Sequence, residues 1–241
     1  MFIGTWINVA GIVLGGAFGL MWKKPISTSN QLFLKIVLGA LTVLCGLKLT
    51  WASLNGSFLQ ILKQVLIVIV ALGLGRTAGR LLHLQKASNR IGQFARRKMT
   101  EETPTDPNRF SNGFAVCALL FCAAPLGIIG AVADGTADYF CPLIIKAAMD
   151  GLGAMSFVGM FGTGVLLSAV PVLVFQGTIT MLSARFLLPL LEHHGLLDSL
   201  NATSGMLIFC VALVIFEIKK IQITDYLPSL VFAPLLTLLF R

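Results

Sequence analysis

FCAAPLGIIGAVADG at residues 121–135 and KAAMDG at residues 146–151 are the two stretches around which the rest of this chain is organised. The first is apolar, is interrupted by Pro125, Gly127 and Gly130, and ends in an acid. The second places a lysine and an aspartate one helical turn apart. Both lie within long apolar regions, where contact with lipid alone requires none of these residues. They are therefore the first candidates for a function.

The composition is that of an integral membrane protein. Of the 241 residues, 56% are hydrophobic and 12% are charged, against about 25% charged residues in soluble domains. Residues 1–22, 110–133 and 199–216 contain no Asp, Glu, Lys or Arg, and a membrane helix needs roughly 20 apolar residues. The runs are continuous rather than alternating, which favours helices over a β-barrel. The sequence predicts an all-α polytopic membrane protein surrounded by the lipid bilayer.

Apolar runs and their breaks predict seven or eight transmembrane segments. Their expected positions are residues 3–22, 32–51, 58–84, 111–132, 139–160, 164–190, 204–218 and 226–240. The last run is short for a full span and contains Pro228 and Pro234. A tilted or half-spanning helix is therefore an alternative there.

The segments group into four parts. These are a first three-helix repeat (1–84), a basic cytoplasmic linker (85–110), a second three-helix repeat (111–191) and two C-terminal helices (192–241). Residues 14–41 align without a gap on residues 125–152, which pairs Lys35 with Lys146. Since each unit has an odd number of helices, the second is expected to be inverted, a recurring plan of secondary transporters. Duplication for fold stability or oligomer packing is the alternative.

Basic residues set the expected orientation. They follow the first segment (Lys23, Lys24), the third (residues 85–109) and the seventh (Lys219, Lys220). Cytoplasmic connections are enriched in such cations, so both termini are predicted to lie outside. The net charge of +8 then reflects membrane topology, and no nucleic-acid partner is expected. Residues 86–99 are predicted to form an amphipathic surface helix; a regulatory loop is the alternative.

Enzyme and metal motifs are not found. The chain has no HExxH, GxSxG or P-loop sequence, and Glu192 with His193 and His194 is a weak ligand pattern. All five cysteines lie in apolar segments without metal-ligand spacing, so buried thiols are expected. We therefore expect no catalytic activity, no cofactor and no metal.

Lys146 and Asp150 are the leading candidates for a solute site. Asp150 falls about twelve residues into its segment, near the middle of the bilayer at about 1.5 Å per residue. A carboxylate at that depth needs a partner, and Lys146 at i−4 can supply one. A purely structural ion pair is the alternative.

The other candidates come from neighbouring segments. Gln176 and Thr178 can coordinate a polar solute or only bond between helices. Pro125 and Gly127 suggest a broken fourth helix whose backbone lines a cavity. Asp134 lies near the outer mouth with Asp138, where both can attract cations, although solvated loop positions are the favoured interpretation. Pro171 can kink its helix.

Small residues recur at helical spacing. Gly11, Gly15 and Gly19 share one helix face, as do Gly75 and Gly79, which allows close helix approach. If those faces met a second copy, the protein would be a homo-oligomeric scaffold rather than a transporter.

Several blocks of the sequence are similar to those of a known protein family. They are IGTWINVAGIVLGGAFG, LFCAAPLGIIGAVADG, KAAMDGLGAMSF, QGTIT, SGMLI and YLPSLVFAPLL, in that order. Together they resemble the YdfK/YqgA family of uncharacterised bacterial inner-membrane proteins, a domain-of-unknown-function family. The resemblance implies a multi-pass protein of the bacterial cytoplasmic membrane, and it implies no substrate or site residues. From the residues themselves we expect a transporter or channel for a small polar or ionic solute.

Overall fold

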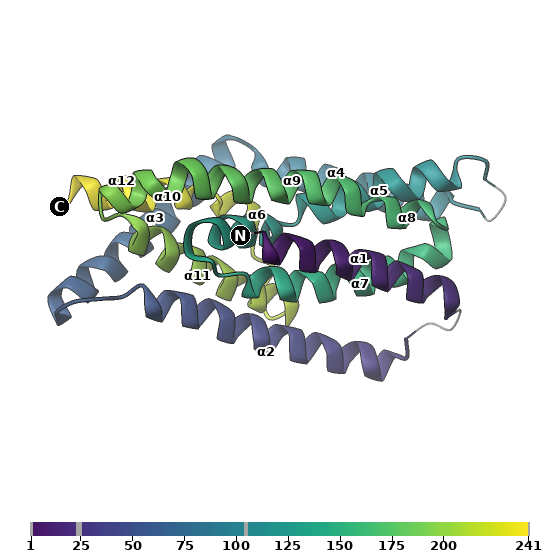
Figure 1. The fold of residues 1–241 in the computed structure, drawn as a ribbon, viewed down its shortest axis with the longest axis horizontal. Helices are drawn as coiled ribbons and strands as arrows, with labels where there is room; N and C mark the ends of the chain where they lie inside the picture. The colour runs from purple at the N-terminus through teal and green to yellow at the C-terminus, as the bar shows by residue number, and fades with distance from the viewer. Residues whose placement is uncertain (1, 23–25, 104–105, 241) are drawn as a thin grey trace.

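A computed structural model describes residues 2–22, 26–103 and 106–240, and the chain in these ranges is helical (Figure 1). The long apolar helices are α1 (Ile3–Met21), α2 (Thr28–Ala52), α3 (Phe58–Leu81), α7 (Cys141–Phe161) and α11 (Leu197–Ile215). A further run, Gly164–His193, is built from α8 (Gly164–Leu167), α9 (Ala169–Leu182), the π-helical turn η1 (Ser183–Leu187) and α10 (Leu188–His193). The expected end of the first helix at Lys23, Lys24 and Pro25, and Pro104 of the linker, lie outside the described residues.

The fourth apolar segment is broken before Pro125, as the sequence predicted. Helices α5 (Arg109–Ala123) and α6 (Pro125–Ala137) meet at an angle of 58°. The cause is local, because proline lacks an N–H and disfavours helical geometry in the residue before it. Ala124 accordingly leaves the helix with φ −64° and ψ 121°.

The described residues contain six helices long and apolar enough to span a membrane, or seven if the bent pair counts as one span. The expected eighth segment is instead two short pieces, the 3-10 turn η2 (Ile223–Tyr226) and α12 (Ser229–Leu239). The two prolines noted there flank or enter α12, and the alternative of a segment shorter than a full span is the one observed.

Helices distant in sequence pair side by side. α1 packs along α7, α2 along α11, and α3 along α12. Figure 1 shows α1 and α7 together in the right-hand half of the view, with α2 passing below them. The connection between α7 and α8 falls at residues 162–163, between the predicted fifth and sixth segments.

Glycine faces make these close pairs possible. A Cβ at Gly11 would lie 2.6 Å from the carbonyl oxygen of Ala147 on α7, and Gly15 and Gly19 meet the α7 backbone in the same way. Gly75 and Gly79 likewise meet the backbone at Ser229 and Asp225. The predicted close approach is confirmed, and its partner is another helix of the same chain.

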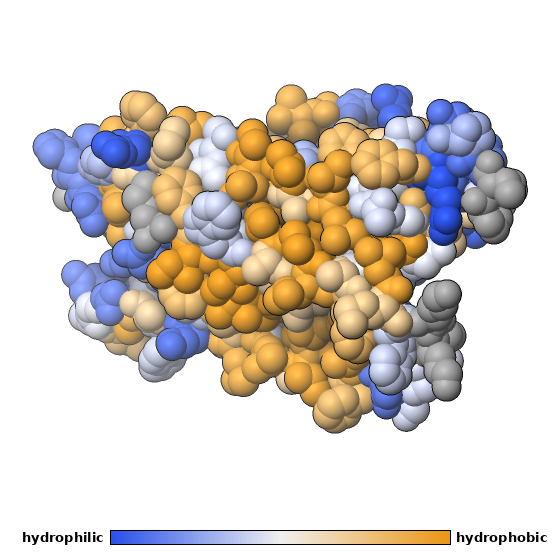
Figure 2. Space-filling model, turned by 45° about the vertical axis from the view of Figure 1, so that its right-hand side comes forward, coloured by the Kyte–Doolittle hydropathy of each residue, from blue (hydrophilic) through white to orange (hydrophobic). Residues whose placement is uncertain are grey.

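An apolar belt crosses the surface of the molecule (Figure 2). Figure 2 shows hydrophobic residues across the middle of one face and hydrophilic residues gathered at the two ends. Many of the belt side chains are large and exposed, such as Leu14 at 69% and Trp51 at 80%. Since a soluble protein rarely exposes so large a contiguous apolar surface, the belt is the surface in contact with lipid.

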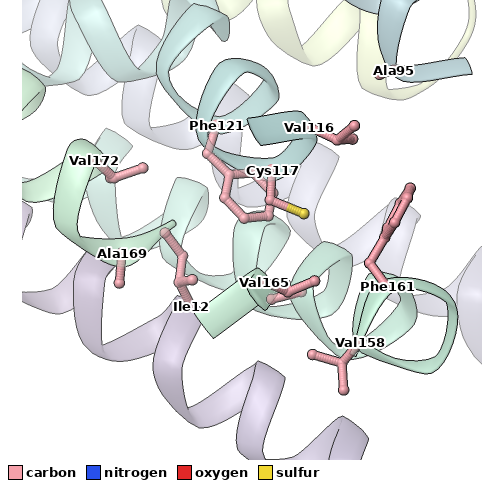
Figure 3. Close-up of a cluster of buried hydrophobic side chains, with 11 residues drawn as sticks. Ile12, Ala95, Val116, Cys117, Phe121, Val158, Phe161, Val165, Ala169 and Val172 are labelled. Atoms are coloured by element: carbon pink, nitrogen blue, oxygen red, sulfur yellow. The ribbon is translucent and has the colours of Figure 1, made fainter. Parts of the chain in front are cut away.

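The basic linker forms α4 (Leu84–Glu101), which confirms the predicted helix. Its buried residue Ala95 joins the interior cluster shown in Figure 3, where Ile12, Phe121, Val158 and Val172 bring together α1, α5, α7 and α9. The N-terminus of α4 is capped from η2, because the backbone N–H of Gln85 donates to Oδ1 of Asp225 over 2.9 Å.

The expectation of five buried thiols is wrong for two of them. Cys45 of α2 and Cys141, the first residue of α7, form a disulfide with Cα atoms 6.3 Å apart. Cys117 is a buried thiol, and Cys122 and Cys210 are half-buried thiols. The disulfide holds the C-terminal half of α2 against the start of α7.

Candidate functional site

The predicted ion pair is formed and enclosed. On α7, Lys146 and Asp150 lie at i and i+4, and Nζ of the lysine donates to Oδ2 of the aspartate. Lys146 is 1% exposed and Asp150 is 7% exposed. A charge in the bilayer interior is expensive unless it has a partner, and here each charge is the partner of the other.

Two carboxamides extend the pair across the helix interface. Asn8 of α1 donates from Nδ2 to Oε1 of Gln176 on α9 over 3.1 Å, and both side chains are fully buried. The same Asn8 side chain lies close enough to Asp150 to interact with its carboxyl group. Asn8 therefore lies between Gln176 and the ion pair, and side chains from α1, α7 and α9 gather in one polar group. We call Asn8, Lys146, Asp150 and Gln176 the polar cluster.

The break in the fourth span lies directly against this cluster. A Cβ at Gly127, in the first turn of α6, would lie 2.6 Å from Cε of Lys146 and 3.0 Å from Nε2 of Gln176. Only a residue without a side chain fits there without displacing them. The backbone of α6 at Gly127 therefore borders both a lysine and a carboxamide.

An apolar wall closes the cluster toward α5. Nζ of Lys146 lies 6.0 Å from the centre of the Phe121 ring, a distance at which a ring face attracts a cation. The thiols of Cys117 and Cys122 on the same helix are close enough to Asp150 to interact electrostatically with its carboxylate. The wall keeps the local dielectric low, so electrostatic interactions within the cluster are strong.

Several buried polar atoms near these helices have no hydrogen-bond partner among the described residues. They include Oδ1 of Asn8 and Nε2 of Gln176 within the cluster, and the hydroxyls of Thr5 and Thr180 elsewhere on α1 and α9. An unsatisfied polar group in an apolar interior is costly. The cluster consequently has one free acceptor and one free donor for a polar guest.

Not every predicted residue reaches the cluster. Thr178 is exposed on the other face of α9, where its hydroxyl donates to its own helix at Val174. Residues two apart on a helix point about 200° apart, whereas residues four apart share a face. Thr180 therefore lies on the same face of α9 as Gln176, and it is buried.

The favoured solvated position for Asp134 is wrong. Its carboxylate is 1% exposed and lies beside the backbone amide of Gly4 at the start of α1, while Oδ2 has no partner among the described residues. Asp138 behaves as expected, because it is an exposed residue that ends α6 with a φ of 48°. The sequence contained no sign that the first turn of α1 would cover Asp134.

A pocket of about 500 Å³ with both polar and apolar lining leads to the helix break. One wall is α4, through Ser88, Asn89, Ile91, Gly92, Gln93 and Arg96; the other is the end of α5 and the start of α6, through Leu120, Ala123, Ala124 and Pro125. We call it the α4 pocket. Neither Lys146 nor Asp150 lines it, but Pro125 is only two residues from Gly127.

A second lysine–carboxylate pair provides a contrast. Lys35, which aligns with Lys146 in the predicted repeat, lies 2.6 Å from Glu217. Their side chains are 30% and 78% exposed, so this is a surface pair of the kind that contributes little to stability. Hydrogen bonding and charge from Lys35 lower the pKa of the Glu217 carboxyl. Only the second lysine of the aligned pair is buried.

Histidine, cysteine and acidic side chains do not gather into a metal site within the described ranges. The rings of His193 and His194 contact each other edge to face at 4.8 Å, with Glu192 exposed beside them.

Helices of spanning length, an apolar belt and an enclosed ion pair define a multi-pass membrane protein. Its family is also established: the chain belongs to the family described as "Protein of unknown function (DUF554)", whose model matches residues 3–238.

Two curated relatives support the same assignment. "Uncharacterized membrane protein YdfK" of Bacillus subtilis is 25% identical over 232 residues, covering 96% of this chain and 93% of that protein. "Uncharacterized protein YqgA" of Escherichia coli is 27% identical over 242 residues, covering 97% and 95%. No solved structure matches the chain. The resemblance noted in the sequence is confirmed.

Proposed function

We propose that this protein carries a small polar or ionic solute across the bacterial cytoplasmic membrane and binds it at the polar cluster. The observation behind the proposal is the enclosed Lys146–Asp150 pair, joined to Asn8 and Gln176 at a broken membrane helix. Helix breaks at membrane depth are tolerated where the backbone lines a site or a cavity.

Energetics support a functional reading of the pair. A buried ion pair adds little net stability, and apolar residues of similar size often serve as well or better. Intramembrane ionisable residues instead tend to mark solute or ion routes. Free hydrogen-bonding atoms on Asn8 and Gln176 are further support, because a purely structural cluster gains from satisfying every donor and acceptor.

Near-complete enclosure favours a carrier over an open channel. Lys146 and Asp150 have almost no exposed surface, so a solute reaches them only after a rearrangement. The 58° break between α5 and α6 and the π-helical turn in the span Gly164–His193 are two places where such helices can bend.

An inverted repeat is part of the proposal. Two three-helix units of opposite orientation would place a site where they meet, near the middle of the bilayer. The alignment of Lys35 with Lys146 supports this plan, and Asp150 distinguishes the second unit because Gly39 occupies the matching position in the first. With the basic connections in the cytoplasm, both termini lie outside.

The alternative function, an oligomeric scaffold, was suggested by the glycine faces, and these faces do not support it. The faces of Gly11, Gly15 and Gly19 and of Gly75 and Gly79 are covered by helices of the same chain. A homo-oligomer would have to assemble through other surfaces.

A thermal-shift screen of small polar and ionic solutes on the purified chain tests the proposal. We expect at least one solute to stabilise the wild type and the control Glu217→Gln, which alters only the surface pair. The same solute should leave the double variant Lys146→Met/Asp150→Asn unchanged. A solute that stabilises all three chains equally binds elsewhere and would contradict the assignment of the site.

A further inference from the structure

The polar cluster has two chemically different halves. Around Gly127 lie the terminal methylene groups of the Lys146 side chain and the amide nitrogen Nε2 of Gln176. The lysine ammonium and the amide NH₂ group donate hydrogen bonds and accept none. Across the cluster, the carboxylate of Asp150 accepts from Lys146 and faces the donor group of Asn8. The first half is electropositive and the second is already occupied by its internal partners.

The helix break adds to the positive half. α6 is thirteen residues long and begins at Pro125, so Gly127 lies in its first turn. The N-terminus of a helix carries a partial positive charge and attracts anions. Nε2 of Gln176, on a fully buried side chain without another partner among the described residues, is directed at this same turn.

Asn8 fixes the direction of that amide. By donating to Oε1 of Gln176, it turns the opposite end of the carboxamide, the NH₂ group, toward Gly127. Three groups that favour negative charge, on α6, α7 and α9, therefore converge on one point.

Charge balance limits what can bind there. Lys146 and Asp150 together are neutral, so an anion entering alone would leave an uncompensated negative charge in the bilayer interior, which is strongly unfavourable.

The helices around the cluster offer few other titratable groups. Among the described residues of α1, α8 and α9 there is none; α5 contributes the Cys117 and Cys122 thiols, with Arg109 at its far end. On α6, Asp134 lies two turns beyond Gly127, and on α2 Lys35 is paired with Glu217 and Lys48 is exposed. Asp150 is thus the group placed to take a compensating proton.

We propose that the cluster binds a small monovalent anion together with one proton, and that the anion replaces Asp150 as the partner of Lys146. This inference rests on the proposed function and gives its solute a chemical class. The proton adds to the Asp150 carboxylate and converts it to a neutral acid. Lys146 keeps its charge and forms charge-assisted hydrogen bonds to the anion, and no other bond changes.

Access is provided by the α4 pocket. Arg96 contributes a cation to its wall, and Pro125 places the pocket next to the first turn of α6. On the predicted orientation this opening faces the cytoplasm. Arg96 attracts an anion into the pocket, where the anion lies beside Pro125. Pro125 is two residues from Gly127, at the proposed binding site.

Calorimetric titration of the full chain in uncharged detergent, with gluconate as the background anion, tests the inference. The probes are chloride, nitrate and pyruvate, and each is titrated from pH 5 to pH 8. We expect at least one probe to bind the wild type with an apparent Kd that falls about tenfold for each unit of decreasing pH, as uptake of one proton per anion requires.

Variants give the expected result a distinct signature. Lys146→Met should weaken binding by roughly tenfold to a hundredfold, because it removes a charge-assisted bond. Asp150→Asn frees Lys146 and should bind the same probe with a Kd that no longer depends on pH. If either single variant fails to fold, Lys146→Met/Asp150→Asn, which leaves no lone charge, should fold and bind no probe.

Several results would overturn the inference. They are binding of none of the three anions by the folded wild type, wild-type binding independent of pH, and undiminished binding by the folded Lys146→Met or double variant. A cation such as methylammonium, or a neutral solute, bound at the cluster would also overturn it while leaving the proposed carrier function intact. If no anion, cation or neutral solute binds at the cluster, that result would count against both the carrier function and the anion inference.

Discussion

At the scale of single residues, each charge of the Lys146–Asp150 pair stabilises the other, although the pair as a whole adds little to the free energy of folding. Each charge is nearly or fully removed from solvent, and removing one partner leaves the other charge unpaired in an apolar interior. Such a loss typically costs about 3–5 kcal/mol, whereas replacing both partners is close to neutral.

This difference predicts strong non-additivity. Lys146→Met and Asp150→Asn should each lower the free energy of unfolding by about 3–5 kcal/mol, and the double variant should recover most of that loss. Denaturant unfolding of the four chains in mixed detergent measures the coupling. Additive losses would mean that the two charges do not depend on each other.

The same scale shows what sequence could predict about the site. Lys146 and Asp150 were predicted as a pair because i and i+4 share a helix face. Asn8 was missed because its partner Gln176 is 168 positions away, and a lone asparagine in a charge-free run carries no local signal. Thr180, by contrast, could have been preferred to Thr178 from helical spacing alone, since it lies four residues from Gln176.

At the scale of elements, the broken fourth span joins the site to the rest of the molecule. Pro125 sets the 58° bend between α5 and α6. The bend brings Gly127, in the first turn of α6, against the polar cluster, while Pro125 lines the α4 pocket. The break and the glycine faces were predicted from proline chemistry and helical spacing. The α2–α7 disulfide was not, because the spacing of Cys45 and Cys141 gives no indication of which helices are neighbours.

Filling the α4 pocket should slow uptake without disturbing the fold. A Cβ at Gly92 would meet nothing within 4 Å, so Gly92→Trp places an indole in the pocket and improves helix propensity as well. We expect solute uptake by reconstituted vesicles to fall at least several-fold.

The matched control for this change is Gly73→Trp. Gly73 on α3 also has open space at its Cβ position, but it does not line the α4 pocket. Equal uptake by the two tryptophan variants would show that the α4 pocket is not the route.

At the scale of the whole molecule, two independent features agree on orientation. Basic connections predict that the end of α2 and the start of α7 face outward, and the Cys45–Cys141 disulfide lies on that side. Disulfides persist in oxidising compartments and are rare in the cytosol. The number of spans was predicted less well, because proline and chain length turned the last apolar run into short pieces.

The orientation can be tested in intact cells with a membrane-impermeant maleimide. Asp138→Cys, in the exposed turn between α6 and α7, should be labelled from outside. Arg97→Cys, on the exposed face of α4, should be labelled only after the membrane is permeabilised. The opposite pattern would invert the topology and place the α4 pocket outside.

Transport of a solute by way of the polar cluster can be measured as flux into vesicles. Proteoliposomes with an inward proton gradient should accumulate the solute identified by the thermal-shift screen when they contain the wild type or Glu217→Gln. With Asp150→Asn, reconstituted in equal folded amount, accumulation should fall to the level of empty vesicles. Accumulation by Asp150→Asn equal to that of the wild type would contradict the account.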